Sequence, residues 1–398
     1  MNCLQLSLPL LFAASSVWCA ETGVALSNLC SRLLLSVGGI PAQEVVCTNG
    51  TNCLTIPLGR RRVELDGHFY WLCSAPSTNW HFAVEDLEQL ALVARPSSTN
   101  AAPRLRVVVD AGHGGADDGA IGVYPCIIEK DLTLDIARRV RDCAPPDLDI
   151  ILTRTNDCAL PLAARVAFAG ATNADLFVSI HANFAANTNA SGVECYAFPP
   201  AGLPGTQGSP NPPPPSKGHA NAHLSAALGW EIHTRLCDAL AAARGTNGVD
   251  RGLKRANFHV LRENPIPATL VELGFLSNEA DSHALTNTHC RAALAQAIVE
   301  GLAAYGRALP DRRALLETFA VERVARERQK AARRAAEEQA RVQAEREQAW
   351  AQFKLDTLRQ FRQARERFGA RALHEWLRRF LAEDGQVPVE QIDNESDN

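Results

Sequence analysis

The amino-acid sequence predicts an α/β fold in which helices cover both faces of a twisted, mostly parallel sheet. Strand-like apolar runs alternate with helical patterns from residue 104 to residue 309, as is typical of layered α/β/α domains. Short strand-like segments fill residues 21–98, and a long run of charged helix formers follows residue 310. We therefore expect a small β-rich domain, a layered α/β domain and a long charged C-terminal helix, in that order.

The composition is that of a globular protein. The chain has 398 residues, 46% hydrophobic and 21% charged, and its 40 basic and 44 acidic residues give a net charge of −4. This near-neutral balance argues against a nucleic-acid-binding protein, which is usually strongly basic. Because only the extreme N-terminus carries an apolar stretch that could engage a membrane, a polytopic membrane protein is excluded.

Residues 1–20 have the pattern of a secretory signal peptide. Residues 4–20 are apolar, too short to span a bilayer comfortably, and followed by small residues. No Lys or Arg precedes this run, so an N-terminal core helix is the alternative. Export predicts a protein of the periplasm or cell envelope with no integral membrane span once the signal is removed.

Ten of the twelve cysteines lie beyond residue 20. An even number in an exported chain permits disulfides, but the sequence does not give their connectivity. No CxxC motif occurs, so a thiolate zinc site or a redox pair of that type has no support. Cys195 and Cys237 lie in apolar runs. There, burial as a small hydrophobic residue is at least as common as a disulfide.

Residues 21–98 predict a small β-rich accessory domain. Their short apolar segments, such as CLTIPL and WHFAVEDL, are separated by turn formers and carry no catalytic pattern. Residues 99–103 are a linker by composition.

Strands and helices alternate over residues 104–309. Proline removes a backbone donor, so the Pro-rich stretch 199–218 is expected to be an exposed loop. The predicted strands are LRVVVD (105–110), DIILTR (149–154), DLFVSI (175–180), GVECYAF (192–198), FHVLR (258–262) and ATLVEL (268–273), and the predicted helices cover 131–140, 163–171, 223–243 and 290–306.

Residues 310–381 form a charged helical region by prediction. Opposite charges recur three or four residues apart, while large apolar residues are sparse between Val324 and Trp350. This favours a weak coiled coil or a solvated single helix. Aromatic residues return from Trp350 to Phe380, so a helical hairpin or an end that binds a protein partner is plausible. Residues 382–398 are an acidic tail that we expect to be disordered.

Four segments carry candidate chemistry. His113 follows a buried strand in the glycine-rich turn AGHGGADDG, whose spacing matches neither a dinucleotide-binding loop nor a P-loop. Glu129 begins a helix, where an acidic residue often only complements the helix dipole. His181 ends an apolar strand, also a common structural position. Glu272 interrupts an apolar strand, where an ionised carboxylate needs a partner or a metal.

The four positions are more informative together. His113 and His181 follow different strands, and open α/β sheets place their sites at the carboxyl ends of strands. Two histidines and one carboxylate make a catalytic zinc set with an open position for water. Glu272 would then serve as a general base. The helix-borne HExxH motif is absent.

Seven stretches of residues 104–308 occur in the order of one known family. They are VVVDAGHGGADDGAIG, EKDLTLDIARRV, ILTRTND, LFVSIHAN, GVECYAF, RGLKRANFHVLRE and PATLVELGFLSNEAD. On these stretches the chain resembles the zinc-dependent N-acetylmuramoyl-L-alanine amidases, which include the bacterial cell-separation amidases. The resemblance covers about half the chain and implies that His113, Glu129 and His181 bind Zn²⁺ and that Glu272 is the catalytic glutamate. The implied reaction is hydrolysis of the amide between N-acetylmuramic acid and L-alanine in peptidoglycan, the expected binding partner.

The resemblance leaves alternatives. A non-catalytic peptidoglycan-binding or scaffold protein with an amidase-like fold is one, and a zinc amidohydrolase with another substrate is a second. In the tightly regulated division amidases, a helix near loop 199–218 blocks the site. Proline forbids such a helix here, so we expect an unblocked site. By analogy with the accessory β-domains of related amidases, residues 21–98 could position the enzyme on the cell wall.

Overall fold

The computed structural model describes residues 23–25, 36–38, 44–48, 52–76, 81–94, 103–124, 127–246 and 250–383. The predicted signal peptide, nearly all of the predicted linker and the acidic tail from residue 384 onward lie outside these residues. The chain forms two compact units, Met1–Glu317 and Thr318–Asn398.

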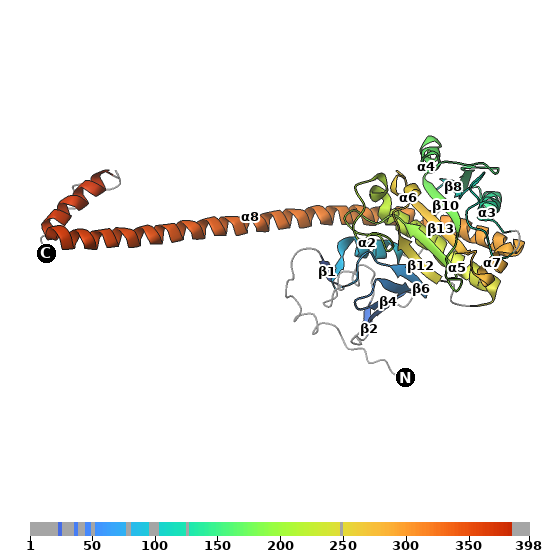
Figure 1. Cartoon of the computed structure of the whole chain (residues 1–398), viewed down its shortest axis with the longest axis horizontal. Helices are drawn as coiled ribbons and strands as arrows, with labels where there is room; N and C mark the ends of the chain where they lie inside the picture. The colour runs from blue at the N-terminus through green and yellow to red at the C-terminus, as the bar shows by residue number, and fades with distance from the viewer. Residues whose placement is uncertain are drawn as a thin grey trace. The chain divides into compact units, whose positions relative to one another are not determined.

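Six strands form the part of the sheet that residues 104–309 were expected to supply (Figure 1). They are β8 (Leu105–Ala111), β9 (Leu148–Leu152), β10 (Leu176–Asn183), β11 (Val193–Ala197), β12 (Asp250–Arg255) and β13 (Ala268–Phe275). Strand β8 runs parallel to β9 and β10, and β10 runs parallel to β13. Strand β11 is antiparallel to β13 and parallel to β12. This part of the sheet is mostly parallel, as predicted.

The N-terminal region is rich in strands, also as predicted, and most of them extend the same sheet. Strand β6 pairs in parallel with β12 at a single register position, Tyr70 opposite Leu253. The sheet order is β2-β3-β4-β5-β6-β12-β11-β13-β10-β8-β9, while β1 and β7 form a separate pair. The bounds are β1 Gly23–Ala25, β2 Ser36–Gly38, β3 Glu44–Thr48, β4 Cys53–Pro57, β5 Arg62–Leu65, β6 His68–Trp71 and β7 His81–Ala83.

Helices lie on both faces of the sheet. On one face, Gly229 of α5 approaches the side chain of Thr269, so α5 packs closely on β13. On the other face, Ala268 and Leu270 join a buried cluster with Ala169 of α4 and residues of α6. The helices of this unit are α2 (Val84–Val93), α3 (Glu129–Cys143), α4 (Leu162–Ala171), α5 (Ala222–Arg244), α6 (His259–Arg262) and α7 (Glu279–Thr286), with a 3₁₀ turn at Lys217–Asn221.

Alternate residues of two central strands change from apolar to polar along one face. In β10 the series is Phe177, Ser179 and His181, and in β13 it is Leu270 and Glu272. Side chains two residues apart in a strand share a face, so these polar groups continue the face that holds the apolar core. The fold therefore places a polar group directly beyond its core, at the carboxyl ends of parallel strands.

The predicted strand at FHVLR (258–262) is wrong. Residues His259–Arg262 form the short helix α6, and the strand in this part of the chain is β12, immediately before it. Val260 and Leu261 are adjacent in sequence and both buried. A strand would turn them to opposite faces, but a run this short does not reveal its period. Helices α2 and α7 were also not predicted.

The last helix of the first unit runs through a proline. Helix α8 spans Thr288–Glu383, and Pro310 lies inside it. Tyr305 and Leu309 are buried just before the proline. Just after it, the buried Arg312 donates to the Leu92 carbonyl and to Glu231 Oε1, at 3.1 Å and 2.5 Å. This packing offsets the backbone hydrogen bond that proline removes.

The second unit carries the rest of α8, which confirms the predicted long charged helix. Residues 327–352 are all exposed and include ion pairs such as Arg333–Glu337. Gly369 has φ 76° and ψ 170°, which interrupts the helical geometry. Among the described residues, no helix combines the length and apolar character needed to cross a bilayer.

Candidate active site

The three predicted metal ligands lie together in the structure. Glu129 Oε1 lies 3.1 Å from His113 Nε2 and 2.9 Å from His181 Nδ1. One ligand atom from each residue lies within 4.8 Å of the others. Side chains separated by up to 68 positions in the chain thus meet at one point, as a shared cation would require.

Each of the three comes from the end of a regular element. His113 follows β8, Glu129 is the first residue of α3, and His181 lies near the end of β10. His113 has φ 60°, a left-handed conformation that is unusual for a residue other than glycine. Such strain persists only where the surroundings hold it, and it is common at functional sites.

Two glycines make room for the cluster. A Cβ added at Gly119 would lie 2.6 Å from Glu129 Oε2 and 2.7 Å from His113 Cδ2. A Cβ added at Gly112 would overlap the ring of His181. The glycine-rich turn therefore lets three bulky side chains approach the backbone closely.

A buried ion pair beneath the turn holds its backbone. Arg165 Nη1 donates to Asp110 Oδ1 and to the Ala111 carbonyl, both at 2.7 Å, and Nη2 donates to the His113 carbonyl at 2.7 Å. Asp110 also accepts from Thr153 Oγ1 and Ser179 Oγ. Removing one member of such a pair usually costs about 3–5 kcal/mol because the other charge stays buried.

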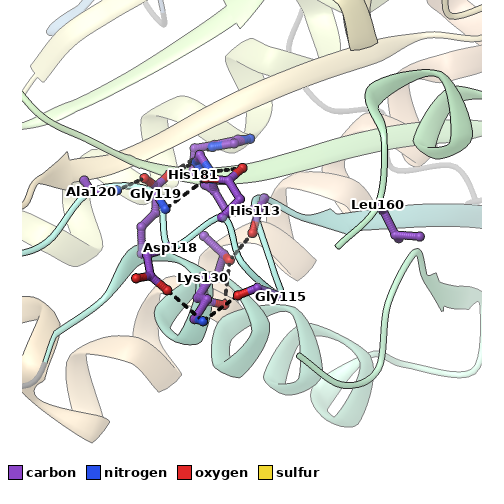
Figure 2. Close-up of polar contacts among 12 residues, drawn as sticks. His113, Gly115, Asp118, Gly119, Ala120, Lys130, Leu160 and His181 are labelled. Atoms are coloured by element: carbon purple, nitrogen blue, oxygen red, sulfur yellow. Dashed lines mark hydrogen bonds and ion pairs between the residues drawn. The ribbon is translucent and has the colours of Figure 1, made fainter. Parts of the chain in front are cut away.

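Lys130 fixes the outer part of the same turn. Figure 2 shows its ammonium between the Asp118 carboxylate, at 2.7 Å, and the Gly115 carbonyl, at 2.8 Å. From the neighbouring strand end, Arg154 donates to the carbonyls of Ala111 and Gly112. The left-handed turn that presents His113 is thus held from both sides.

The outer nitrogen of His113 also has a partner. Its Nδ1 lies 2.9 Å from Asp117 Oδ2, which leaves Nε2 to face Glu129. Metal-binding histidines usually donate their second nitrogen to a carboxylate or a carbonyl, which fixes the tautomer and the ring orientation. Asp117 lies in the same glycine-rich turn and was not among the residues predicted for the site.

The electrostatics suit a cation. Burial alone would raise the pKa of Glu129, but hydrogen bonds from His113 and His181 outweigh burial and hold that pKa well below its usual range. The same bond to Glu129 raises the pKa of His113. Backbone amides of Ala120 and Ala182 donate to the two oxygens of Glu129 and support its charged form. The cluster is therefore built around a negative charge that a bound cation could share.

Glu272 lies on the strand next to His181. It is directly opposite His181 across β10 and β13, and directly opposite Glu194 across β11 and β13. Its Oε2 is buried and has no hydrogen-bond partner in the protein. Burial, with a smaller contribution from the charges of Glu129 and Glu194, raises the pKa of Glu272 well above its usual value. An unpaired buried carboxylate is costly, so its partner is expected among substrate, water or metal.

Glu194 was missed in the sequence, although it breaks an apolar strand just as Glu272 does. In contrast to Glu272, it is fully paired: Arg251 Nε donates to Oε2 at 2.9 Å, Lys254 donates to the same oxygen, and Asn183 Nδ2 donates to Oε1 at 2.6 Å. These partners keep the pKa of Glu194 low despite its burial. The two adjacent carboxylates therefore have opposite pKa shifts: the pKa of Glu194 is lowered and that of Glu272 is raised.

The Pro-rich loop contains no α-helix over residues 199–218. The Gly205 carbonyl of this loop accepts a hydrogen bond from Arg61 Nη2, and the backbone amide of Thr206 donates to the Arg255 carbonyl. The side chains of His113 and His181 keep 23% and 21% of their surface exposed. Both imidazoles are therefore open to solvent.

Comparison with known proteins identifies the family. The model of the N-acetylmuramoyl-L-alanine amidase family matches residues 107–304 of this chain. The protein YqiI of Bacillus subtilis is 33% identical over 219 residues, covering 54% of this chain and 93% of the relative. The sporulation-specific N-acetylmuramoyl-L-alanine amidase of the same species is 33% identical over 201 residues, covering 50% of this chain and 67% of the relative. The chain belongs to the N-acetylmuramoyl-L-alanine amidase family.

The predicted family and enzyme class of this amidase are therefore confirmed. A solved structure with a similar chain is the catalytic domain of CwlV, an amidase from Bacillus (Paenibacillus) polymyxa var. colistinus. It is 33% identical, covers 50% of this chain and 96% of that chain, and has a TM-score of 0.40. The matched family segment includes all four predicted site residues of the amidase.

The close approach at Gly119 gives a prediction for the amidase. We expect Gly119→Ala to lower activity at least tenfold, because the new methyl group would push Glu129 and His113 apart. The matched control is Gly59→Ala. Gly59 has the same φ of 67° but nothing within 4 Å of an added Cβ, so only backbone strain of about 1 kcal/mol is expected there. Equal losses of activity in the two variants would contradict the steric explanation.

Proposed function

We propose that the chain is a zinc-dependent amidase in which His113, Glu129 and His181 hold the ion and Glu272 acts as the general base. The observation that supports it best is the convergence of two imidazoles and one carboxylate, next to a carboxylate oxygen that has no partner in the protein. Two nitrogen donors and one oxygen donor make a donor set typical of catalytic zinc, which keeps a position open for water or substrate.

When bound, zinc would supply Lewis-acid polarisation of the scissile carbonyl and would lower the pKa of a water molecule. The chain supplies the proton transfers. Glu272 takes a proton from the attacking water at its carboxylate and later delivers it to the nitrogen of the leaving L-alanine. The raised pKa of Glu272 suits the second transfer, since it favours the protonated form that donates the proton to the leaving group.

Other residues position these groups. Asp117 orients the ring of His113, and the pair of Arg165 and Asp110 keeps the strained turn in place. Glu194 is held ionised by Lys254 and Arg251, and its negative charge disfavours ionisation of Glu272. The proposed ligands and the general base thus depend on neighbouring charged residues that orient them or change their pKa.

Product identification tests this proposal. The purified chain is incubated with peptidoglycan sacculi, and the soluble products are analysed by mass spectrometry together with the zinc content of the enzyme. Release of free stem peptides with an L-alanine amino terminus is expected. Zinc binding without any product would favour the alternative, a non-catalytic peptidoglycan-binding or scaffold protein. Products cut at another bond would favour a different amidohydrolase.

We also propose that the amidase is exported to the periplasm or cell envelope, because its proposed substrate lies outside the cytoplasmic membrane. The signal-like sequence at residues 1–20 supports this proposal. Fractionation of cells that produce the full chain, with amino-terminal sequencing of the recovered protein, tests it. Recovery in the cytoplasm with an intact N-terminus would contradict it.

The charged helix offers a surface for a protein partner. Trp350 and Phe353 are 58% and 50% exposed, and their rings stack with centroids 5.5 Å apart. Large apolar side chains grouped on a solvated helix usually mark an interaction site. We propose that this part of α8 binds a protein that places the amidase in the envelope.

Truncation of this helix should separate placement from catalysis. We expect deletion of residues 331–398 to leave kcat and KM on soluble muropeptides unchanged within about twofold, because residues 331–352 are exposed and all proposed catalytic groups precede them. The same deletion should change where a fluorescent fusion gathers in cells. The double variant Trp350→Ala, Phe353→Ala is the matched test in the full chain. An unchanged location in both variants would remove the idea of a partner.

A further inference from the structure

A second group of metal-type donors lies where the N-terminal strands join the main sheet. His68 of β6, Cys237 of α5 and Asp250 of β12 each offer one ligand atom, and these atoms lie within 4.8 Å of one another. Within the described part of the chain, only this group and the proposed active site meet that criterion with three or more donors. None of the three takes part in the proposed amidase chemistry.

The carboxylate of Asp250 is the centre of this group. Its Oδ2 lies 3.1 Å from His68 Nδ1, and its Oδ1 lies 2.8 Å from His233 Nε2. Cys237 lies one helical turn after His233, so both side chains point from the same side of α5. The Cys237 sulfur is 3.5 Å from His233 Nε2. Three elements therefore direct an imidazole, a thiol and a carboxylate at one place.

We propose that His68, Cys237 and Asp250 bind a zinc ion that stabilises the fold, with His233 supporting the Asp250 carboxylate from the other side. Sulfur, imidazole nitrogen and carboxylate oxygen are the donors that zinc takes in proteins. Ligand atoms around a tetrahedral zinc lie about 3.4–3.8 Å apart, so side-chain shifts of about 1 Å suffice to close the site. Binding releases the thiol proton of Cys237 to solvent.

A hydrogen-bond network without an ion is the alternative. Asp250 also accepts from the backbone amides of Phe69 and Gly252, at 3.0 Å and 2.7 Å, so its oxygens are satisfied without a metal. A thiol would contribute little to such a network, because S–H is a weak hydrogen-bond donor. Cys237 is nevertheless turned toward these polar groups at 3% exposure. The thiol is the feature that favours zinc over a simple network.

The site is also accessible to an ion. The side chains of His68 and Asp250 keep 19% and 14% of their surface exposed, while His233 is fully buried behind them. Exposure on one side provides an entry path and room for a water molecule as the fourth ligand. The buried side holds the hydrogen bond from His233 that would orient the carboxylate.

An ion at this place would join two parts of the first unit. Strand β6 pairs with β12 at only one register position, so the N-terminal strands are attached to the sheet by a short backbone contact. Zinc bound by His68 and Asp250 would link these two strands directly, and Cys237 would add α5. Because the ion binds only the folded arrangement, it should raise the thermal midpoint of the unit.

Metal counting in variants of the full chain tests the proposal. We expect two zinc ions per chain in the wild type, one in Cys237→Ala and one in His181→Ala. Cys143→Ser is the matched control, because that thiol is exposed on α3 and should leave both ions in place. If Cys237→Ala retains the wild-type zinc content, the second site does not exist. If the wild type holds one ion that only Cys237→Ala removes, the second site stands and the proposed active-site zinc is wrong.

Cobalt substitution of the wild type gives a test that does not depend on how a variant folds. A cysteine thiolate bound to Co²⁺ produces a sulfur-to-metal charge-transfer band in the near ultraviolet, whereas the histidines and glutamate of the active site contain no sulfur. We expect this band in the wild type and in His181→Ala, and its loss in Cys237→Ala and His68→Asn. Cobalt-loaded wild type without the band would overturn the proposal. Circular dichroism confirms that each variant is folded.

Discussion

Replacement of His181 by alanine is expected to reduce zinc at the active site below detection and to abolish amidase activity. His181 is one of three proposed ligands, and its Nδ1 lies 2.9 Å from Glu129 Oε1. Without it, one imidazole and one carboxylate are left, and such a pair binds zinc too weakly to survive dialysis. Metal analysis of dialysed protein and release of stem peptides from sacculi measure the two effects.

The control for this variant is His289→Ala. His289 is exposed near the start of α8 and belongs to neither group of donors, so its removal should leave zinc content and activity unchanged. The thermal midpoint distinguishes loss of metal from loss of fold. A folded His181→Ala protein that keeps its full zinc content would show that His181 is not a ligand, and the proposed centre would then be wrong.

The meeting of distant residues at this site could be predicted from the sequence because sheet geometry is simple. His113 and His181 follow strands that were recognisable as apolar runs, and parallel strands bring their carboxyl ends to one edge. The position of Glu129 at the start of a helix had an ordinary structural explanation, so only the family resemblance indicated its role. The structure now places it between the two imidazoles.

The supporting residues could not be predicted in the same way. Arg165 lies on a helix whose pattern gave no sign that its side chain reaches back to the carbonyls of Ala111 and His113. Charged side chains that act on backbone atoms leave no periodic signal in a sequence. Glu194 did leave one, since it interrupts an apolar strand, and the rule applied to Glu272 would have found it.

The group around Asp250 shows a different reason why a site could not be predicted from the sequence. Its members come from β6, α5 and β12, and the pairing of β6 with β12 joins a region that composition alone marked as separate. The sequence left Cys237 open to a disulfide or to burial as a small hydrophobic residue, and the residue is buried. Burial did not indicate what the thiol faces. Only the tertiary arrangement brings His68, some 170 residues earlier in the chain, to the same place.

The second large effect is expected for Glu272→Gln, which should keep zinc yet lower kcat by about 10²–10⁴-fold with little change in KM. The amide has the shape of the carboxyl group but cannot take a proton from water. Glutamine also carries no charge, so the electrostatic cost of a buried carboxylate beside Glu129 and Glu194 disappears. We therefore expect the variant to be at least as resistant to heat as the wild type. Steady-state kinetics, metal analysis and thermal unfolding measure the three quantities.

The combination of outcomes decides the role of Glu272. A general base predicts lost turnover, retained zinc and unchanged or higher stability, whereas a metal ligand predicts that zinc and turnover are lost together. A merely structural residue predicts lower stability with nearly normal kcat in the protein that remains folded. Because Oε2 of Glu272 has no partner in the protein, removing its charge leaves no other buried group unpaired. A fall in kcat at constant zinc content therefore reports the proton transfer itself.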